Sequence, residues 1–452
     1  MVSRVKTSGK QMEAIASNTA GIDIGSEEHY VAVDSDSSER PVRSFGCYTP
    51  DLEEMARWLL ECGVKTVAME STGVYWIPVY QVLEQHGLEV MLVDARHVKH
   101  VPGRKTDVCD CQWLQQLLSY GLLRGCFIPP AEVQPVREYW RQRASHIESI
   151  SREILHMQKA LEQMNVQLHK VLRDITGVTG MKIIRAIVSG ERRPLVLAAM
   201  REPGCKKSES EIMKALSGNY REEHIFALTQ ALELYDVLHE KVVDCDKRVE
   251  QCLCTFASKA DPATMPPKKS KRGSRRKNQP HFDLEKHLYR ITGVDLTAID
   301  GIESLTAQTV VAELGFDLSD FATEKHLCSW LALSPEHRIT GGKVKTRRTR
   351  KSANRVATAL RLAAQSLHSS KTALGAFFRR IKAKKGTPKA ITATARKLAC
   401  LIYRMLRYGM EYVDLGQREY ENRYQEQEHK LLQKRAAALG YTLTPLPNGG
   451  VS

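Results

Sequence analysis

The chain is 452 residues long, which predicts two to three domains, because a single core seldom grows beyond about 250–300 residues. Lys and Arg number 67 against 52 Asp and Glu, and the resulting net charge of +15 favours a polyanionic partner. No apolar run reaches the roughly 18–20 residues that cross a bilayer, and the N-terminus lacks an apolar signal core, so we expect a cytoplasmic protein without a membrane partner.

The eleven cysteines are scattered along the chain. None stands in a Cys-x-x-Cys motif, and the pairs Cys109–Cys111 and Cys252–Cys254 have the wrong spacing for a usual zinc site. We therefore interpret the cysteines as reduced thiols of a cytosolic protein.

Strand and helix patterns alternate from about residue 18 to 128. Seven elements are predicted there, joined by turns rich in Gly, Ser and Asp. In chain order they are strands Ala20–Ile24, Tyr30–Val33 and Val42–Phe45, helix Asp51–Cys62, strand Thr66–Met69, helix Val74–His86 and strand Leu88–Val93. Antiparallel strands followed by alternating strands and helices are typical of a mixed, ribonuclease-H-like sheet.

Four carboxylates stand at the ends of these elements. Asp23 and Glu70 each close a short apolar strand, while Asp107 and Asp110 lie one turn apart at the start of a further helix, where Thr106 can act as the cap. This order can bring all four to one end of the sheet. Negative charges so near to one another repel unless cations neutralise them. Hard divalent metal ions, which prefer oxygen ligands, neutralise such charges. The pattern predicts a metal-dependent phosphoryl-transfer site.

Each acid also has an ordinary structural explanation. Asp23 stands in GIDIG, a common strand-end turn that is similar to the first phosphate loop of sugar kinases and actin-like ATPases. The second Gly-rich acidic loop of those folds is not visible in the sequence. The other three acids would each be stabilised by a helix N-terminus. The four acids together are a more specific signal of a metal site than any one of them. In that arrangement Arg104 and Lys105 would lie beside the metals, suited to a scissile phosphate.

The region from 136 to 260 changes to a seven-residue repeat, which calls for a supercoiled partner helix. The repeats consist of Ile147, Ile150, Ile154, Met157, Leu161, Met164, Leu168 and Val171, and of Leu228, Ala231, Tyr235, Leu238, Val242, Cys245, Val249 and Cys252. An antiparallel coiled-coil hairpin within the chain and pairing between subunits are equally allowed.

Three further segments follow. Residues 261–283 form a basic linker that is either solvated and disordered or a non-specific phosphate clamp. Residues 284–413 predict a compact helical domain, and 414–452 a polar tail with one helix and a frayed end.

Basic side chains crowd the helical domain and suit contact with nucleic acid, although solvated helix faces would have the same composition. The first cluster contains Lys343, Lys345, Arg347, Arg348, Arg350, Lys351 and Arg355, and the second contains Arg379, Arg380, Lys382, Lys384 and Lys385. Backbone N–H groups at the turn around Gly301 can grip a DNA phosphate in hairpin fashion.

Residues 18–128 resemble the N-terminal domain of the DEDD transposases of bacterial insertion sequences, the family numbered one hundred and ten. The matching motifs are Asp23 in GIDIG, Glu70 in MESTGVYW, and Asp107 with Asp110 in ARHVKHVPGRKTDVCD. Residues 284 to about 405 resemble the C-terminal transposase domain of that family. There LTAIDGIESLTAQTVVAELG looks like its degenerate helix-hairpin-helix, followed by ITGGKVKTRRTRKSANRVATALRLAAQSL and GTPKAITATARKLACLIYRML.

The resemblance implies a DNA recombinase with a RuvC-like first domain, similar to a Holliday-junction resolvase. It implies that the four acids hold Mg²⁺ while a serine of the C-terminal domain attacks a DNA phosphate and forms a covalent phosphoserine. It also implies a non-coding bridge RNA that pairs with target and donor DNA, and a dimer or tetramer joined through the coiled coil. Localisation would be bacterial, cytoplasmic and nucleoid-associated.

The chain departs from the family pattern at the nucleophile. Thr340 stands directly before Gly341, Gly342 and Lys343, where the family has serine. A threonine hydroxyl can attack phosphorus, but its β-branch stiffens χ1 and crowds the approach. Thr340 is therefore either a working substitute or a sign of an impaired copy, and nearby Ser334 does not occupy the matching place.

Two other functions remain consistent with the residues. One is a RuvC-like junction-resolving endonuclease, in which a metal-activated water attacks the phosphate. The other is a non-catalytic nucleic-acid-binding protein whose carboxylates hold no metal.

Overall fold

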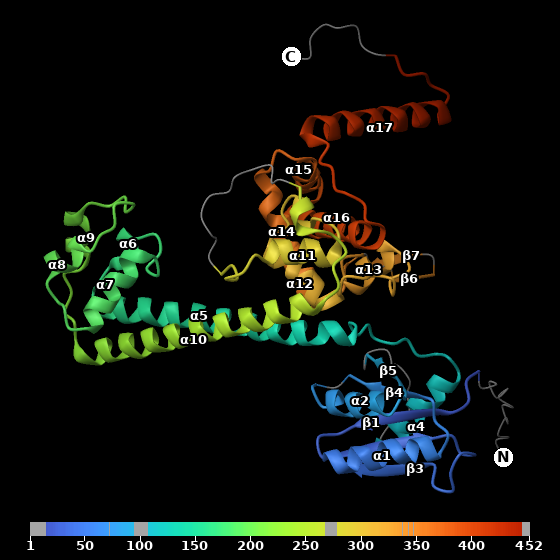
Figure 1. Cartoon of the computed structure of the whole chain (residues 1–452). Coiled ribbons are helices and arrows are strands. Elements are labelled where there is room, and N and C mark those ends of the chain that lie inside the picture. The colour runs from blue at the N-terminus through green and yellow to red at the C-terminus, as the bar shows by residue number, and fades with distance from the viewer. Residues whose placement is uncertain are drawn as a thin grey trace, which may run out of the picture. The chain divides into compact units, whose positions relative to one another are not determined.

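The computed structural model describes residues 15–71, 73–94, 107–266, 278–336, 338–341, 343–346 and 348–444, and for residues 107–109 and 338 the backbone alone (Figure 1). The chain divides into two units, the first ending at Ile128 and the second beginning at Pro129, each with its own hydrophobic core. None of the described helices combines the length and the apolar composition that crossing a membrane requires.

The first unit is built around a five-stranded sheet in the order β3-β2-β1-β4-β5. β1 pairs antiparallel with β2 and parallel with β4, and this mixed sheet fits the predicted ribonuclease-H-like fold. Its elements are β1 (Thr19–Ile24), β2 (Glu28–Val33), β3 (Val42–Gly46), α1 (Thr49–Glu61), β4 (Thr66–Glu70), α2 (Trp76–Gln85), β5 (Glu89–Val93) and α4 (Asp107–Ser119). The seven elements predicted between residues 20 and 93 are confirmed, with ends that differ by two residues at most.

Helices cover both sides of this sheet, because alternate residues of each strand face opposite sides. Ile22 of β1 and Met69 of β4 are fully buried in a core shared with α1 and α2. Gly21 faces the other way, against α4. Leu114 of α4 and Val93 of β5 form a smaller apolar cluster on that second side. Residues of odd number in β1 therefore lie toward α4.

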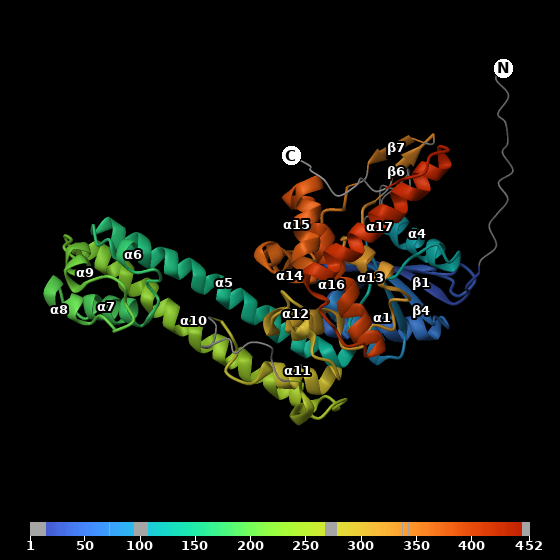
Figure 2. The same ribbon diagram turned by 90° about the horizontal axis from the view of Figure 1, so that it is seen from above.

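The second unit begins with a pair of long helices. α5 (Gln134–Gln163) and α10 (Glu222–Thr255) lie side by side and run in opposite directions (Figures 1 and 2). Their apolar stripes meet in one core, with Met157 and Leu228 fully buried. This is the helical hairpin that the seven-residue repeat predicts, whereas the supercoiling itself stays a prediction.

The predicted continuation of the first helix to Val171 is wrong. α5 ends at Gln163, and Asn165 has a φ of +55°, a left-handed conformation that a right-handed helix cannot contain. Leu168 and Val171 instead belong to the short helix α6 (Leu168–Val171). Their apolar side chains still reach the core, because the chain turns back there and packs α6 against the helices that follow.

Three more short helices, α7 (Val178–Val188), α8 (Pro194–Ala199) and α9 (Glu209–Ala215), join α6 at the far end of the helix pair. Ile184, Leu197 and Ile212 are fully buried there and extend the core of α5 and α10. This segment, called the head below, caps the hairpin with a small bundle.

The remaining elements surround the end of the pair where α5 begins (Figure 1). They are α11 (Leu284–Thr292), α12 (Ser304–Leu314), α13 (Glu324–Trp330), β6 (Arg338–Thr340), β7 (Lys343–Thr346), α14 (Arg355–Ser366), α15 (Ala373–Lys385), α16 (Thr387–Tyr408) and α17 (Gly416–Ala438). The prediction of a purely helical domain is incomplete, because β6 and β7 form an antiparallel hairpin. Helix-hairpin-helix geometry around α12 stays a prediction, and residues 267–277 of the basic linker lie outside the described residues.

Ion pairs join the two long helices to each other and α5 to α12. Arg143 of α5 donates to Asp246 of α10 at 2.5 Å, with both side chains almost fully buried. Glu313 of α12 accepts from Arg141 at 2.7 Å and from Arg137 at 3.2 Å, both of α5. Breaking such a pair leaves a buried charge without compensation, so these contacts hold both α10 and α12 against α5.

Candidate active site

Asp23 and Glu70 lie level with each other at the carboxyl ends of neighbouring strands. β1 and β4 are parallel, and Ile22 is paired with Met69, so the next residue of each strand is Asp23 on one and Glu70 on the other. Backbones of paired strands are about 4.8 Å apart, and residues at one level share a face. Both side chains are partly exposed and stand on the face that α4 covers.

α4 brings its N-terminus to the same edge of the sheet. The side chain of Gln115 donates to Thr19 Oγ1 at 3.2 Å near the start of β1. A Cβ on Gly21 would lie 2.2 Å from the carbonyl oxygen of Cys111 and 2.4 Å from the amide nitrogen of Gln115. The helix therefore runs opposite to β1, and its first turns, which contain Asp110, reach the level of Asp23.

The electrostatics of Cys111 support this placement. Its pKa is raised to about 12, chiefly by burial, and the negative charges of Asp23 and Asp110 raise it further. Two carboxylates from separate elements thus act on one buried thiol, which stays protonated at neutral pH. The same proximity makes them mutually repulsive unless a cation lies between them.

The rest of the predicted metal site lies partly outside the described residues. Asp107 begins α4 one turn before Asp110, but its side chain is not described, and Arg104 and Lys105 fall outside the described ranges. Within those ranges no three Asp, Glu, His or Cys side chains are grouped so as to hold a metal ion. The donor chemistry still fits a hard divalent cation, because every candidate ligand on this edge is a carboxylate.

Thr340 lies in the second unit, at the end of β6 where the hairpin turns. It pairs with Lys343 of β7 across Gly341, whose φ is +55°. The side chains of Thr340, Lys343 and Lys345 are exposed, as is Arg348 just beyond the hairpin. The hairpin therefore presents a hydroxyl among cations, while Arg347 lies outside the described residues.

Sequence reasoning overlooked Gly21. The position carries no reactive group, and its importance comes only from the backbone of α4 that lies against it. A usable signal was present, since Gly21 stands two residues before Asp23 and therefore on the same face of the strand.

We expect Gly21→Ala to destabilise the first unit by about 1–3 kcal/mol, because the new Cβ overlaps backbone atoms that cannot rotate away. Displacement of α4 should also speed alkylation of Cys111. Chemical denaturation and mass-mapped alkylation test both effects. Gly125→Ala is the matched control, since its Cβ would meet only the flexible Met91 side chain at 3.4 Å. Equal stability and equal alkylation rates of the two variants would contradict the close approach of α4 to β1.

Comparison with known families identifies both units. Residues 20–166 match the profile of the DEDD transposase of IS110 elements, described as a transposase. Residues 295–379 match a second profile, described as the transposase IS116/IS110/IS902 family. The first match contains the acids of the sheet edge, and the second contains Thr340 and the hairpin. A search of curated proteins found no match. Together the two matches span about half of the chain, in the order of the family's two domains, and the chain therefore belongs to the IS116/IS110/IS902 family of transposases, enzymes that act on DNA.

Proposed function

We propose that this transposase cleaves and rejoins DNA strands to move an insertion sequence, with its carboxylate edge holding Mg²⁺. The observation that carries the proposal is the register of β1 and β4, which sets Asp23 level with Glu70 while α4 brings Asp110 alongside. DEDD transposases generally use divalent metal ions. Asp23, Glu70, Asp107 and Asp110 would hold them, and bound ions neutralise charge that develops on the scissile phosphate.

The proposed nucleophile is the hydroxyl of Thr340. Its oxygen would form a bond to phosphorus while a phosphodiester P–O bond breaks, and the departing DNA hydroxyl would take up a proton in exchange for the one that Thr340 loses. The product is a phosphothreonyl ester with one free DNA end. Exposure of Thr340 at the hairpin and the neighbouring ammonium groups of Lys343 and Lys345 support this role, since those cations suit flanking phosphates.

Because the β-branch of Thr340 crowds its hydroxyl, a second function is also consistent with the residues. A RuvC-like junction-resolving endonuclease needs the same acids but no protein hydroxyl, because a metal-activated water attacks the phosphate. A non-catalytic nucleic-acid-binding protein needs neither. The two experiments that follow separate these functions.

Thr340→Ala should abolish a covalent protein–DNA adduct, which denaturing electrophoresis of labelled DNA detects. Thr340→Ser should form the adduct at least as fast as the natural chain, and up to about a hundredfold faster if the methyl group displaces the hydroxyl by about 1 Å. Ser334→Ala serves as the control and should leave the adduct unchanged. An adduct that persists in Thr340→Ala removes Thr340 from the mechanism.

Asp23→Asn should eliminate strand cleavage while DNA binding persists, because the amide cannot supply a negatively charged metal ligand. Cleavage of a supercoiled plasmid carrying the element's ends, with Mg²⁺ or with a chelator, measures the loss. Asp36→Asn, an exposed aspartate in the same unit, is the matched control and should cleave normally. Full cleavage by Asp23→Asn would remove Asp23 from the proposed metal site, and absence of cleavage by the natural chain would reject both enzymatic functions.

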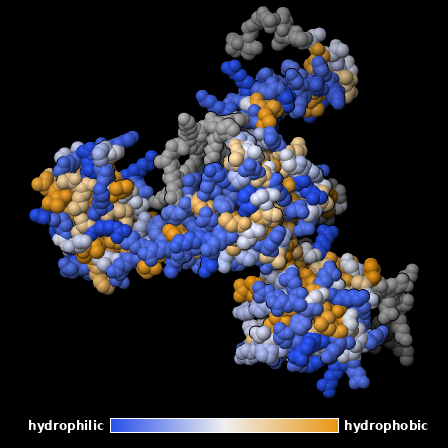
Figure 3. All heavy atoms as spheres, in the orientation of Figure 1, coloured by the Kyte–Doolittle hydropathy of each residue, from blue (hydrophilic) through white to orange (hydrophobic). Residues whose placement is uncertain are grey.

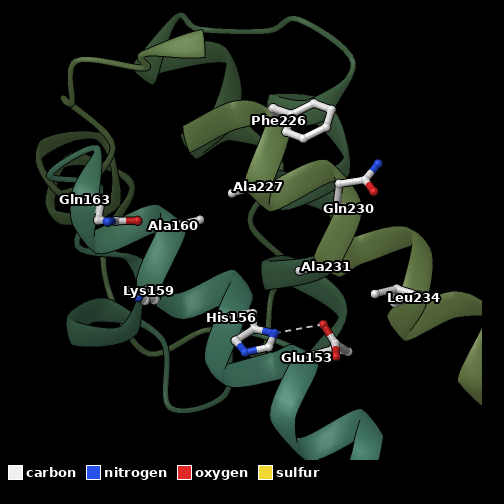
Figure 4. A pocket seen from close by; sticks show the side chains of 10 residues that line it. All are labelled: Glu153, His156, Lys159, Ala160, Gln163, Phe226, Ala227, Gln230, Ala231 and Leu234. Carbon is white, nitrogen blue, oxygen red and sulfur yellow. Dashed lines mark hydrogen bonds and ion pairs between the residues drawn. The ribbon is translucent and has the colours of Figure 1, made fainter. Parts of the chain in front are cut away.

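We also propose a guide RNA and a homo-oligomer for this transposase. Exposed apolar side chains on the helix pair and the head support pairing of copies (Figure 3): Val178, Leu195 and Phe226 are each more than 60% exposed. Phe226 borders a hollow between α5 and α10 that also contains Ala160 and Leu234 (Figure 4). Burial of these side chains would favour association of two or four copies.

Sedimentation of the chain purified with RNA retained should therefore give a mass at least twice 51.0 kDa, and nuclease treatment should release a bound RNA. Phe226→Glu should shift the mass toward the monomer, whereas Glu153→Gln at the same hollow should not. A monomer free of RNA at micromolar concentration would count against both parts of the proposal.

A further inference from the structure

A basic hollow lies on the C-terminal helices, on the surface of α16. α16 supplies most of its lining, and Glu324 of α13 and Phe377 of α15 complete it. The α16 residues that line it are Ala393, Arg396, Lys397, Cys400, Leu401 and Arg404. None of these positions belongs to the candidate active site or to the basic clusters singled out in the sequence.

The charges that line this hollow do not balance. Three cations face a single carboxylate, and that carboxylate is already engaged: Glu324 accepts from Arg404 at 2.7 and 3.1 Å. Within the described part of the chain, neither Arg396 nor Lys397 takes part in an ion pair. The hollow therefore carries uncompensated positive charge on α16.

Lys397 is the most constrained of these cations. It is largely removed from solvent, and burial, followed by repulsion from Arg380 and Arg404, lowers its pKa. Its ammonium lies 4.8 Å from the ring centre of Phe377 and 5.4 Å from that of Tyr420. These aromatic faces compensate the charge only in part, since a cation–π contact contributes about 0.5–2 kcal/mol. An anion in the hollow would compensate it fully.

We propose that this hollow binds phosphate groups of a nucleic-acid backbone, a contact that rests on the proposed function of the chain as a transposase and adds a site to it. Lys397 and Arg404 are seven residues apart, about 10 Å along the helix. That length allows contact with more than one phosphate of a strand. A phosphodiester backbone fits better than an acidic protein segment, because Arg380 of α15, whose guanidinium lies 5.5 Å from the ring centre of Phe377, continues the positive surface beside the hollow.

Salt-dependent binding by the full chain tests the proposal. Fluorescence anisotropy with duplex DNA, single-stranded DNA and single-stranded RNA, in chelator, gives the slope of log K against log salt. Lys397→Gln and Arg396→Gln should each lower the magnitude of that slope by about 0.7–0.9, which is the value of one lost phosphate contact. Lys397→Arg should restore it. Lys389→Gln, an exposed cation on α16 outside the hollow, is the matched control and should change the slope less.

Protection of Cys400 from alkylation gives a second readout. This thiol lines the hollow, and the hydrogen bond from Cys328, at 3.6 Å between the sulfur atoms, lowers its pKa and keeps it reactive. Each nucleic acid that occupies the hollow should slow alkylation of Cys400, while the exposed Cys254 on α10 should react unchanged. Protection by DNA alone or by RNA alone supports the site and identifies its ligand.

The proposed site would be overturned if the slopes of Lys397→Gln and Arg396→Gln equalled that of Lys389→Gln and Cys400 were not protected. That result would point instead to an acidic protein partner or a solvated surface. These measurements need no strand cleavage. A chain that fails to form the covalent adduct but keeps the slope change and the protection would refute the proposed mechanism and leave the phosphate site standing.

Discussion

The close packing of α4 on β1 is the constraint on which the candidate catalytic edge depends. The helix backbone comes so near that any side chain at Gly21 would overlap it, so the strand and the helix fit together only because this residue is glycine. That fit brings Asp110 to Asp23, and the strand register adds Glu70. Negative charge gathered at this edge would be stabilised by a bound cation, and the positive end of the α4 dipole favours it as well.

The second unit carries the proposed nucleophile, Thr340. Its hairpin presents the Thr340 hydroxyl on a short, exposed two-stranded ribbon, which is a flexible support by itself. Just after the hairpin, Arg350 donates to the backbone carbonyl of Ser329 in α13 at 2.8 Å and ties this segment to the helices. The proposed chemistry would use a hydroxyl of the second unit and carboxylates of the first.

The cationic side chains of α5 and those of α16 have different surroundings. Buried and partly buried arginines of α5 are matched by carboxylates and serve the fold. Arg396 and Lys397 of α16 lie in a hollow whose one carboxylate is bound to Arg404, and in the described structure no acid matches them. Removing a cation from water without a partner is unfavourable, so an unmatched and half-buried lysine is better explained by a ligand than by stability.

Much of this organisation follows from local patterns in the sequence. The alternation of strands and helices up to residue 93, the two long amphipathic helices and the positions of the four acids all depend on periodicity and on short motifs, which act within a few residues. The pattern failed where periodicity carries no signal. It extended the first long helix past Asn165, whose left-handed backbone a helix cannot contain, and it missed the β6–β7 hairpin because strands of three and four residues leave almost no periodic signal.

Tertiary structure alone decided which of these residues meet. Composition shows that the chain is basic, but only the packing of α13, α15 and α16 sets Lys397 and Arg396 at one hollow, where the only acid among the described lining residues, Glu324, is paired with Arg404. Likewise, Gly21 is an unremarkable strand residue until α4 is placed against it. The sequence by itself determined the elements and the chemical groups they carry, because those depend on neighbours along the chain. The candidate active site and the basic hollow could be found only from the fold, because strand pairing and helix packing bring together residues that are far apart in the sequence.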